Sequence, residues 1–225
     1  MRIDCHLHTA RYSACSRLDP ELACKLALVR GLDALVFTEH HLYWPREELA
    51  HLGADHPGLT LLTGVELTLA EGYDLVLISG EARPRLAAYP PFSAVVDALA
   101  AVREHVFAFV AHPFRYDPEL TRELAEIMAW ADGLEADSVN VLRAGYHVVG
   151  DRIRPDCAAL TEQTAQSFGL VQVYNSDAHD EPAVGAIAND FPGETVRDED
   201  ALVRLLKRAQ PGEHQDPALL ARLLG

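Results

Sequence analysis

The sequence predicts an α/β fold in which seven strands form a distorted, TIM-like (β/α)7 barrel. Seven apolar, strand-like runs mostly alternate with helical patterns, which is typical of parallel sheets. Several of these runs end in histidines or carboxylates, and the carboxyl ends of barrel strands share one face. The 225 residues also suffice for one such barrel, which takes about 250 residues. We therefore expect a single domain over residues 1–225, with polar ligands gathered at one mouth of the barrel.

Each expected element has a local signal. Residues 2–7 form the first strand. Asp19 is the expected N-cap of a helix that runs to about residue 30, because Pro20 suits its first turn and Gly31 its end. Further strands are expected at residues 33–38, 59–67, 73–79, 106–111, 133–136 and 170–175. Further helices are expected at about residues 46–52, 93–104, 118–131, 156–168, 199–209 and 217–224.

Two segments depart from simple alternation of strands and helices. The strands at 59–67 and 73–79 are separated by only a few residues, too few for a crossover helix. Residues 137–155 have only the apolar pair Val148-Val149 as a regular feature. We expect this second segment to be a mobile or substrate-facing loop.

The composition is acidic, with 19 Lys and Arg against 34 Asp and Glu, a formal charge of -15. Proteins that bind duplex nucleic acid nonspecifically neutralise phosphates with basic side chains, and no long basic run is present. We therefore expect no duplex nucleic acid partner. A small phosphorylated substrate remains compatible, because bound divalent ions reverse the local field. The sequence leaves the oligomeric state open.

The chain has neither a signal-peptide pattern at its start nor an apolar run of the roughly 20 residues that a membrane helix needs. We expect a cytoplasmic protein with no membrane partner. The four cysteines lack CxxC spacing and are expected to be reduced. They are Cys5, Cys15, Cys24 and Cys157.

Candidate metal ligands begin in the first strand. His6 and His8 are two positions apart, so their side chains project from the same face and both imidazoles can reach one ion. Asp4 precedes them with the same spacing, and either orients an imidazole or is an ordinary strand-end acid. Asp177 and His179 repeat the spacing of the two histidines near the end of the last strand.

Two further candidates lie in or next to apolar runs. Glu66 lies in a run of Leu, Val and Thr, where an unpaired carboxylate would be costly to desolvate, so it requires a metal or a strong donor. His112 is followed by Pro113, which fixes the turn after the strand at 106–111.

Four short segments between residue 2 and about residue 190 carry a family resemblance. They are Asp4-x-His6-x-His8-Thr9, Thr38-Glu39-His40, Ala111-His112-Pro113 and Ser176-Asp177-Ala178-His179. In this order they resemble the polymerase and histidinol phosphatase (PHP) family of metal-dependent phosphoesterases. The resemblance implies a seven-stranded barrel with two or three divalent ions at the strand ends. Imidazole and carboxylate ligands favour Zn, Mn or Fe.

The resemblance also implies roles for individual residues. The implied metal ligands are His6, His8, His40, Glu66, His112, Asp177 and His179. Glu66 would bridge two ions, and the resemblance selects His40 over its neighbour His41. His41 stays open between the rim of the site and solvent, and Glu39 is interpreted as a structural or outer acid.

The chain departs from the family pattern in two places. Some members carry a histidine or aspartate where this chain offers Ser13, Ala14 and Cys15, so a third ion is expected to be weakly held or absent. Some members have a histidine after the fourth strand, near Glu81, which is a candidate ligand or a plain loop residue. Arg115 is a candidate to bind a substrate phosphate with its bidentate guanidinium, or else a surface cation. Arg143 and Arg152 are weaker candidates of the same kind.

The resemblance implies hydrolysis of a phosphate ester by a metal-activated hydroxide. The catalytic candidates are Glu66, His40 and His179, together with Arg115, which is proposed from its position three residues after His112. His40 and His179 would bind a further ion or steer the leaving oxygen and its proton. Two alternatives stay open: an amidohydrolase-like enzyme acting on a C–N or C–O bond, and a non-catalytic metal-binding module. Lys25 and Lys207 both fall in expected helices, which disfavours amidohydrolases that bridge their ions with a modified lysine. The substrate is not defined by the sequence.

Overall fold

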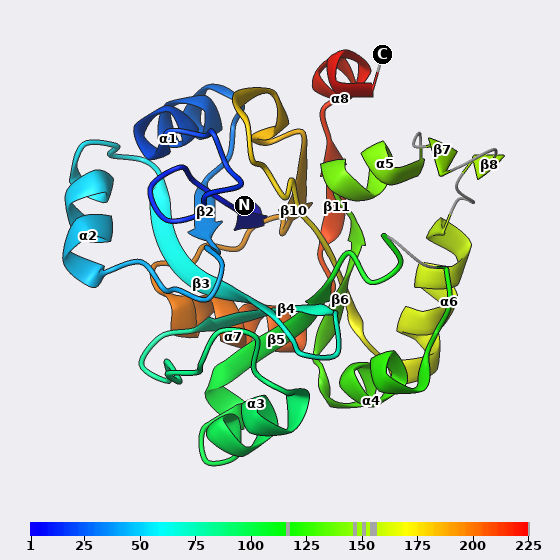
Figure 1. Ribbon diagram of the computed structural model, residues 1–225. Coiled ribbons are helices and arrows are strands. Elements are labelled where there is room, and N and C mark those ends of the chain that lie inside the picture. The colour runs from blue at the N-terminus through cyan, green and yellow to red at the C-terminus, as the bar shows by residue number, and fades with distance from the viewer. Residues whose placement is uncertain (116–117, 146–147, 150–151, 154–156, 225) are drawn as a thin grey trace.

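The structure, a computed structural model, describes residues 1–115, 118–145, 148–149, 152–153 and 157–224. Its main strands are β1 (Arg2–Leu7), β2 (Ala34–Phe37), β3 (Thr60–Thr68), β4 (Asp74–Ser79), β5 (Val106–Ala111), β6 (Gly133–Asp137), β9 (Val171–Tyr174), β10 (Ile187–Asp190) and β11 (Gly212–Gln215). They form one sheet in the order β11-β10-β1-β2-β3-β4-β5-β6-β9. β10 and β11 also contact β9, so the sheet nearly closes into a barrel (Figure 1).

Most helices lie around the outside of this barrel (Figure 1). They are α1 (Pro20–Val29), α2 (Arg46–Ala54), α3 (Phe92–Leu99), α4 (Arg122–Trp130), α5 (Val139–Gly145), α6 (Ala158–Phe168), α7 (Glu199–Arg208) and α8 (Pro217–Leu224). Helix α7 packs against β4 and β5, and α6 packs against β6. Within the described residues, every helix is too short or too polar to cross a lipid bilayer.

The predicted α/β barrel is confirmed, but its strands are not all parallel. β1, β2 and β3 are parallel, whereas β4 runs antiparallel to both of its neighbours, β3 and β5. The turn between β3 and β4 is tight, because the Leu69 N–H donates to the Tyr73 carbonyl at 2.8 Å and Gly72 adopts a φ of 87°. The short linker seen in the sequence therefore reverses the chain.

The sheet contains two strands that the sequence did not predict, β10 and β11. β10 pairs antiparallel with β1, so that Asp190 lies opposite Arg2. β11 pairs antiparallel with β10, and its residues Gly-Glu-His-Gln lack the apolar alternation of a typical strand. Both strands are defined by pairing with a distant part of the chain, which a local pattern does not report.

The expected loop at residues 137–155 is wrong in part, because it contains α5 and two short paired strands, β7 (Val148–Val149) and β8 (Arg152–Ile153). Ser138 precedes α5, and its hydroxyl accepts the Val141 N–H at 3.3 Å. This N-terminal cap was a local signal for the helix. The side chains of Arg143 and Arg152 lie outside the described part of the chain.

Two other helices differ from expectation at their ends. The helix expected at 93–104 ends at Leu99, and a short 3-10 turn, Arg103–His105, follows it. The helix expected at 118–131 begins only at Arg122, because the Thr121 hydroxyl accepts the Leu124 N–H at 3.1 Å and so caps the helix there.

The apolar core lies directly beside the polar strand ends. Val36, Phe107 and Phe109 belong to one buried cluster, which also contains apolar side chains of α7. The His6 ring lies edge-on to Phe109, with 6.2 Å between ring centroids. His6 therefore lies directly against the buried apolar core.

Candidate metal centre

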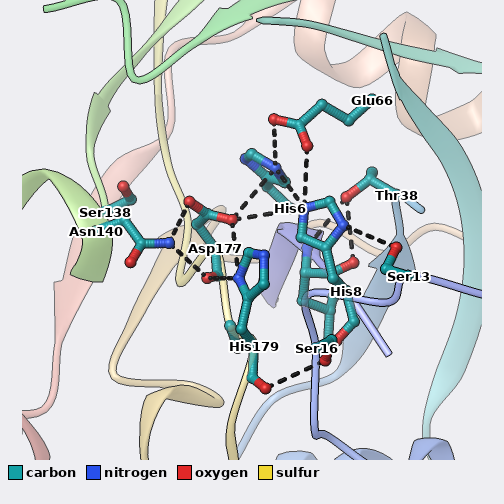
Figure 2. Close-up of polar contacts among 12 residues, drawn as sticks. His6, His8, Ser13, Ser16, Thr38, Glu66, Ser138, Asn140, Asp177 and His179 are labelled. Atoms are coloured by element: carbon teal, nitrogen blue, oxygen red, sulfur yellow. Dashed lines mark hydrogen bonds and ion pairs between the residues drawn. The ribbon is translucent and has the colours of Figure 1, made fainter. Parts of the chain in front are cut away.

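Seven polar side chains from five strands converge at one end of the barrel. His6 and His8 come from the end of β1, His40 from just after β2, Glu66 from β3, His112 from just after β5, and Asp177 and His179 from just after β9. These are the residues that the sequence analysis selected as ligands, Glu81 excepted. Figure 2 shows His6, His8, Glu66, Asp177 and His179 pointing toward one another.

Glu66 lies between four imidazoles. Its Oε1 atom is 3.3 Å from Nε2 of His6 and 3.3 Å from Nε2 of His112. Its Oε2 atom is 3.2 Å from Nε2 of His8 and 2.9 Å from Nδ1 of His40. The two oxygens thus face different pairs of histidines, which is the arrangement that a carboxylate bridging two ions requires.

Asp177 faces the same histidines from the opposite side. Its Oδ1 atom lies 3.5 Å from Nε2 of His6, Nε2 of His8 and Nδ1 of His179. This buried oxygen accepts no hydrogen bond from any described residue. The other oxygen, Oδ2, accepts a hydrogen bond from the Asn140 side chain at 2.6 Å. A buried carboxylate oxygen left without a donor fits a cation ligand.

The donor atoms form three overlapping groups, each with its atoms within 4.8 Å of one another. The groups are His6 with Glu66 and His112, His6 with His8 and Asp177, and His8 with His40 and His179. Imidazole nitrogens and carboxylate oxygens at these separations fit divalent Zn, Mn or Fe. The residues of this chain therefore fit divalent metal ions.

The charged side chains of the cluster shift one another's pKa values. Burial lowers the pKa of His6, but the carboxylates of Asp177, Glu135 and Glu66 outweigh burial and raise that pKa well above its ordinary value. Burial raises the pKa of Glu66, but the neighbouring His6 and His8 rings lower it well below its ordinary value. Because imidazole nitrogens must lose their protons to bind a metal, metal binding at this site would release protons.

Two of these residues have unusual backbone conformations. His112 has a φ of 30° and Asp177 a φ of 47°, both in the left-handed region that non-glycine residues rarely occupy. His41 and Tyr89, at the rim, have φ values of 58° and 54°. Such strained residues persist only where surrounding structure holds them, and they gather at functional sites.

Three residues near the cluster were missed by the sequence analysis. Glu135 on β6 lies 3.0 Å from Nδ1 of His6. Asn140 on α5 holds Asp177, as described above. Asp74 begins β4, and its Oδ2 atom is 3.9 Å from Nδ1 of His112. Glu135 had a usable signal, since it is a carboxylate within an apolar strand, as Glu66 is. Asp74 required knowing that β4 runs antiparallel, which brings its first residue to the ligand end.

Asp4 and Glu39, the two other acids in the segments that carry the family resemblance, make structural contacts. Asp4 accepts the backbone N–H groups of His6 at 3.3 Å and Ser176 at 3.0 Å, so it holds the backbone and not an imidazole. Glu39 accepts the backbone N–H of Thr9 and the Trp44 indole N–H at 2.8 Å, consistent with a structural acid.

His41 and the residues at the positions of the first departure from the family pattern, Ser13 and Cys15, have the following surroundings. The His41 ring lies at the rim, 5.0 Å from the Tyr89 ring. The Ser13 hydroxyl lies 3.4 Å from Nδ1 of His8 and accepts the His40 N–H at 3.3 Å, so a neutral side chain stands beside the third group. The Cys15 thiol is free and the residue is exposed. The expectation of a weak or absent third ion stays a prediction.

Glu81 and Arg115 lie outside the three donor groups. The Glu81 side chain is 91% exposed and lies 3.5 Å from Arg46, so the structure does not bring it to the cluster. The reason is strand direction: Ser79, at the end of β4, pairs with Val106, at the opposite end of β5 from His112. Arg115 donates its backbone N–H to the His112 carbonyl at 3.0 Å, which keeps it next to the cluster.

Comparison with known proteins agrees with this fold. The family described as PHP-associated matches residues 159–211. A two-domain protein from Bacteroides vulgatus that contains a predicted PHP-like metal-dependent phosphoesterase has a similar structure, with a TM-score of 0.66, 18% identity, and coverage of 100% of this chain and 68% of that one. These findings support a PHP family assignment. No curated protein matches the chain.

Two further structures have a fold similar to that of this chain. PsfC from Pseudomonas syringae has a TM-score of 0.71 and 18% identity, over 100% of this chain and 94% of that one. Endonuclease Q in complex with a 27-mer duplex substrate, with an abasic lesion at its active site, has a TM-score of 0.54 and 14% identity, over 90% of this chain and 56% of that one.

The endonuclease Q complex overturns the expectation that excluded duplex nucleic acid. A protein with this barrel fold holds a duplex at its active site. The formal charge of -15 describes the whole chain, whereas a duplex at the site would meet only the face around it, where bound cations would reverse the local field. Net charge is therefore not a sufficient reason to exclude a duplex partner for this barrel fold.

Proposed function

We propose that this chain is a metal-dependent hydrolase that cleaves a phosphate ester. One observation carries the proposal: the buried Glu66 carboxylate contacts four imidazoles, and Asp177 faces three donor nitrogens from the other side. The similarity to a structure described as PHP-like metal-dependent phosphoesterase supports the same reaction class.

The three donor groups would hold two or three divalent ions. Glu66 would be shared between ions, with His6 and His112 on one oxygen and His8 and His40 on the other. Divalent ions in such a site polarise a phosphoryl oxygen and lower the pKa of a coordinated water. Glu66 is 2% exposed at its side chain and Asp177 1%, so the protein excludes bulk water from the inner side of the site.

His40 and His179 are the exposed members of the ligand set, with side chains 35% and 25% exposed. They therefore lie on the side from which a substrate enters. If Nδ1 of His179 donates to the Asp177 carbonyl, 3.0 Å away, its Nε2 atom is free to bind a further ion or to exchange a proton with the leaving oxygen. Arg115, tied by its backbone to His112, is the proposed cation for a substrate phosphate.

The two lysines of the chain lie away from the site, which supports a carboxylate as the bridging ligand. Lys25 pairs with Glu21 at 3.8 Å, and Lys207 lies 3.3 Å from Asp132. Hydrolases that bridge two ions with a modified lysine need that lysine among the ligands. The arrangement therefore favours a phosphoesterase over an amidohydrolase of the lysine-bridged kind.

A substrate screen with metal analysis on the same sample tests the proposal. The protein is loaded with Zn²⁺ or Mn²⁺ and given an aryl phosphate monoester, an aryl phosphate diester and a duplex oligonucleotide with an abasic lesion. We expect cleavage of at least one of them, loss of that cleavage in Asp177→Ala, and retention in Glu81→Gln. A metal-replete protein that cleaves none would overturn the proposal in favour of a non-catalytic metal module. An aryl amide and a lactone are tested in parallel, and cleavage of either of these, with no phosphate ester cleaved, would identify an amidohydrolase.

A further inference from the structure

Glu135 is a buried carboxylate on β6 whose two oxygens contact two different candidate ligands. Its Oε1 atom lies 3.0 Å from Nδ1 of His6, and both side chains have no solvent exposure. Its Oε2 atom accepts the backbone N–H of His112 at 3.1 Å. Glu135 belongs to none of the three donor groups. It lies behind the ligands from β1 and β5 and contacts both.

The contact with His6 fixes which ring nitrogen faces the site. An ionised carboxylate only accepts hydrogen bonds, so Nδ1 of His6 must carry the hydrogen that lies toward Glu135. In the neutral ring, Nε2 then has the lone pair. Nε2 is the atom that lies 3.3 Å from Glu66 and 3.5 Å from Asp177. The hydrogen bond to Glu135 therefore selects the tautomer that can bind a metal within the cluster.

The contact with His112 holds a strained backbone. His112 has a φ of 30°, a strained conformation that persists only when its surroundings impose it. The N–H of this residue donates to Glu135, and its carbonyl accepts from Arg115 at 3.0 Å. The conformation directs Nε2 of His112 to within 3.3 Å of Glu66.

Glu135 is itself fixed from a third side. The Asn175 side-chain amide donates to Oε1 of Glu135 at 3.0 Å. The side-chain oxygen of Asn175, Oδ1, accepts the Cys5 N–H at 3.0 Å and the Asn189 side-chain N–H at 2.9 Å. These bonds fix Asn175 between β1, β10 and the end of β9. Rotation of the Glu135 carboxylate would break its own bonds to His6, His112 and Asn175.

We propose that Glu135 is a positioning residue that sets the His6 tautomer and the His112 backbone together, and so determines metal affinity at the two donor groups that contain His6. The inference rests on the proposed metal-dependent function, which it deepens. Outer partners of metal-binding histidines typically change metal affinity by about 10–100-fold when removed.

The test compares Glu135→Gln with Asp137→Asn, the same acid-to-amide change two residues along β6. Asp137 points elsewhere, with its carboxylate 3.3 Å from the Gln215 amide. A glutamine keeps the size of Glu135, but one of its two acceptors becomes a donor, so it cannot serve both His6 and His112. We expect zinc affinity, measured by chelator competition, to fall about 10–100-fold in Glu135→Gln and to stay within twofold of wild type in Asp137→Asn.

Two further measurements separate positioning from a general structural role. In zinc-saturated wild type, proton NMR should show a downfield signal from the His6 Nδ1–H bonded to a carboxylate, and Glu135→Gln should lose it. Glu135→Asp keeps the charge but draws its oxygens back, and we expect it to lose zinc affinity as well. A folded Glu135→Gln with wild-type zinc affinity would overturn the proposal. If that variant does not fold, wild-type affinity in Glu135→Asp would overturn it instead.

Zinc affinity is measured without a substrate, so this test is separate from that of the reaction. A protein that binds zinc through Glu135-dependent ligands but cleaves no phosphate ester would disprove the proposed function and leave the role of Glu135 standing.

Discussion

The Nε2 atoms of His6 and His8 lie 3.1 Å apart, and neither side chain has any solvent exposure. Glu66 places one carboxylate oxygen 3.3 Å from the first nitrogen and the other 3.2 Å from the second. At this distance one ring can donate its N–H to the lone pair of the other, or both lone pairs can bind one cation, whereas two protonated rings would repel each other. Glu66 faces both nitrogens and so favours a positive charge at the pair.

Replacing Glu66 with glutamine should remove the shared ligand. The amide has one acceptor oxygen in place of two and carries no charge, so it cannot face both pairs of histidines. We expect zinc affinity to fall by more than the roughly 10–100-fold that loss of an outer partner costs. Hydrolysis of the best substrate should fall to background. Glu81→Gln is the control, since Glu81 is exposed and away from the cluster. Wild-type zinc affinity in Glu66→Gln would contradict a ligand role for Glu66.

Metal removal should destabilise the fold measurably. A ligand that binds only the folded state stabilises it by about 2.7 kcal/mol when present at 100 times its Kd. We expect the Tm of chelator-treated protein to rise on addition of Zn²⁺ or Mn²⁺, and most of this rise to be absent in Asp177→Ala. Thermal unfolding followed by circular dichroism measures both. An identical Tm with chelator and with excess metal would rule out binding by the native state.

Asp137 should make stability depend on pH. Burial, then the nearby Glu213 carboxylate, raises the pKa of Asp137 from 3.8 to about 7 in the folded protein. The folded state thus holds this proton more tightly than the unfolded chain. Its stabilising contribution is complete below pH ~4 and is lost as the pH rises through about 7. Asp137→Asn cannot lose a proton, so its Tm relative to wild type should be higher at pH 8 than at pH 5.

This comparison is made with chelator present, so that metal binding does not contribute. The titrating groups of the cluster are common to both proteins and cancel in the difference. The same Tm difference at both pH values would show that Asp137 has an ordinary pKa.

Gly64 should be required for the close approach of β3 and β4. A Cβ atom at this position would lie 2.8 Å from the Leu77 carbonyl oxygen and 3.1 Å from the Thr38 methyl group. We expect Gly64→Ala to destabilise the protein by about 1–3 kcal/mol, as overpacking typically does. Because Gly64 lies two residues before Glu66 on β3, the same change should weaken zinc binding.

Gly53→Ala is the matched control for this substitution. Gly53 lies in α2, and an added Cβ would meet only the Leu61 side chain at 3.9 Å, an ordinary contact. Alanine is favoured over glycine in a helix by up to about 1 kcal/mol, so this variant should be slightly more stable than wild type. Chemical denaturation of both variants measures whether each substitution raises or lowers the free energy of unfolding. Equal stability of Gly64→Ala and Gly53→Ala would contradict the close approach of β3 and β4 at Gly64.

Local signals in the sequence were sufficient for much of the barrel. Asp19, Pro20 and Gly31 define α1, whose N-cap bond from Leu22 to Asp19 is 3.0 Å long. Apolar runs defined the central strands. β10 and β11 could not be predicted in this way, because β11 is polar and β10 is a strand through its pairing with β1, from Arg2 to Asp190.

The candidate site also has some features that local sequence predicts and others that depend on strand direction. The spacing of His6 and His8, and the carboxylate of Glu66 in an apolar run, are local features that indicate a metal site. Glu81, left open between a ligand and a loop residue, lies away from the cluster because the tight turn before β4 decides the direction of that strand. That direction brings Asp74 opposite Ala111, beside His112, and takes Glu81 to the other end of β5.

By itself, the sequence determined the order of most strands and helices and indicated a set of candidate metal ligands, since both follow from local spacing and residue type. Tertiary structure alone decided which of these residues meet, which acid contacts His6 and His112, and which strands are antiparallel. Glu135 touches His6, 129 positions away in the chain. Such contacts depend on how the sheet closes, and closure is a property of strand pairing over the whole chain.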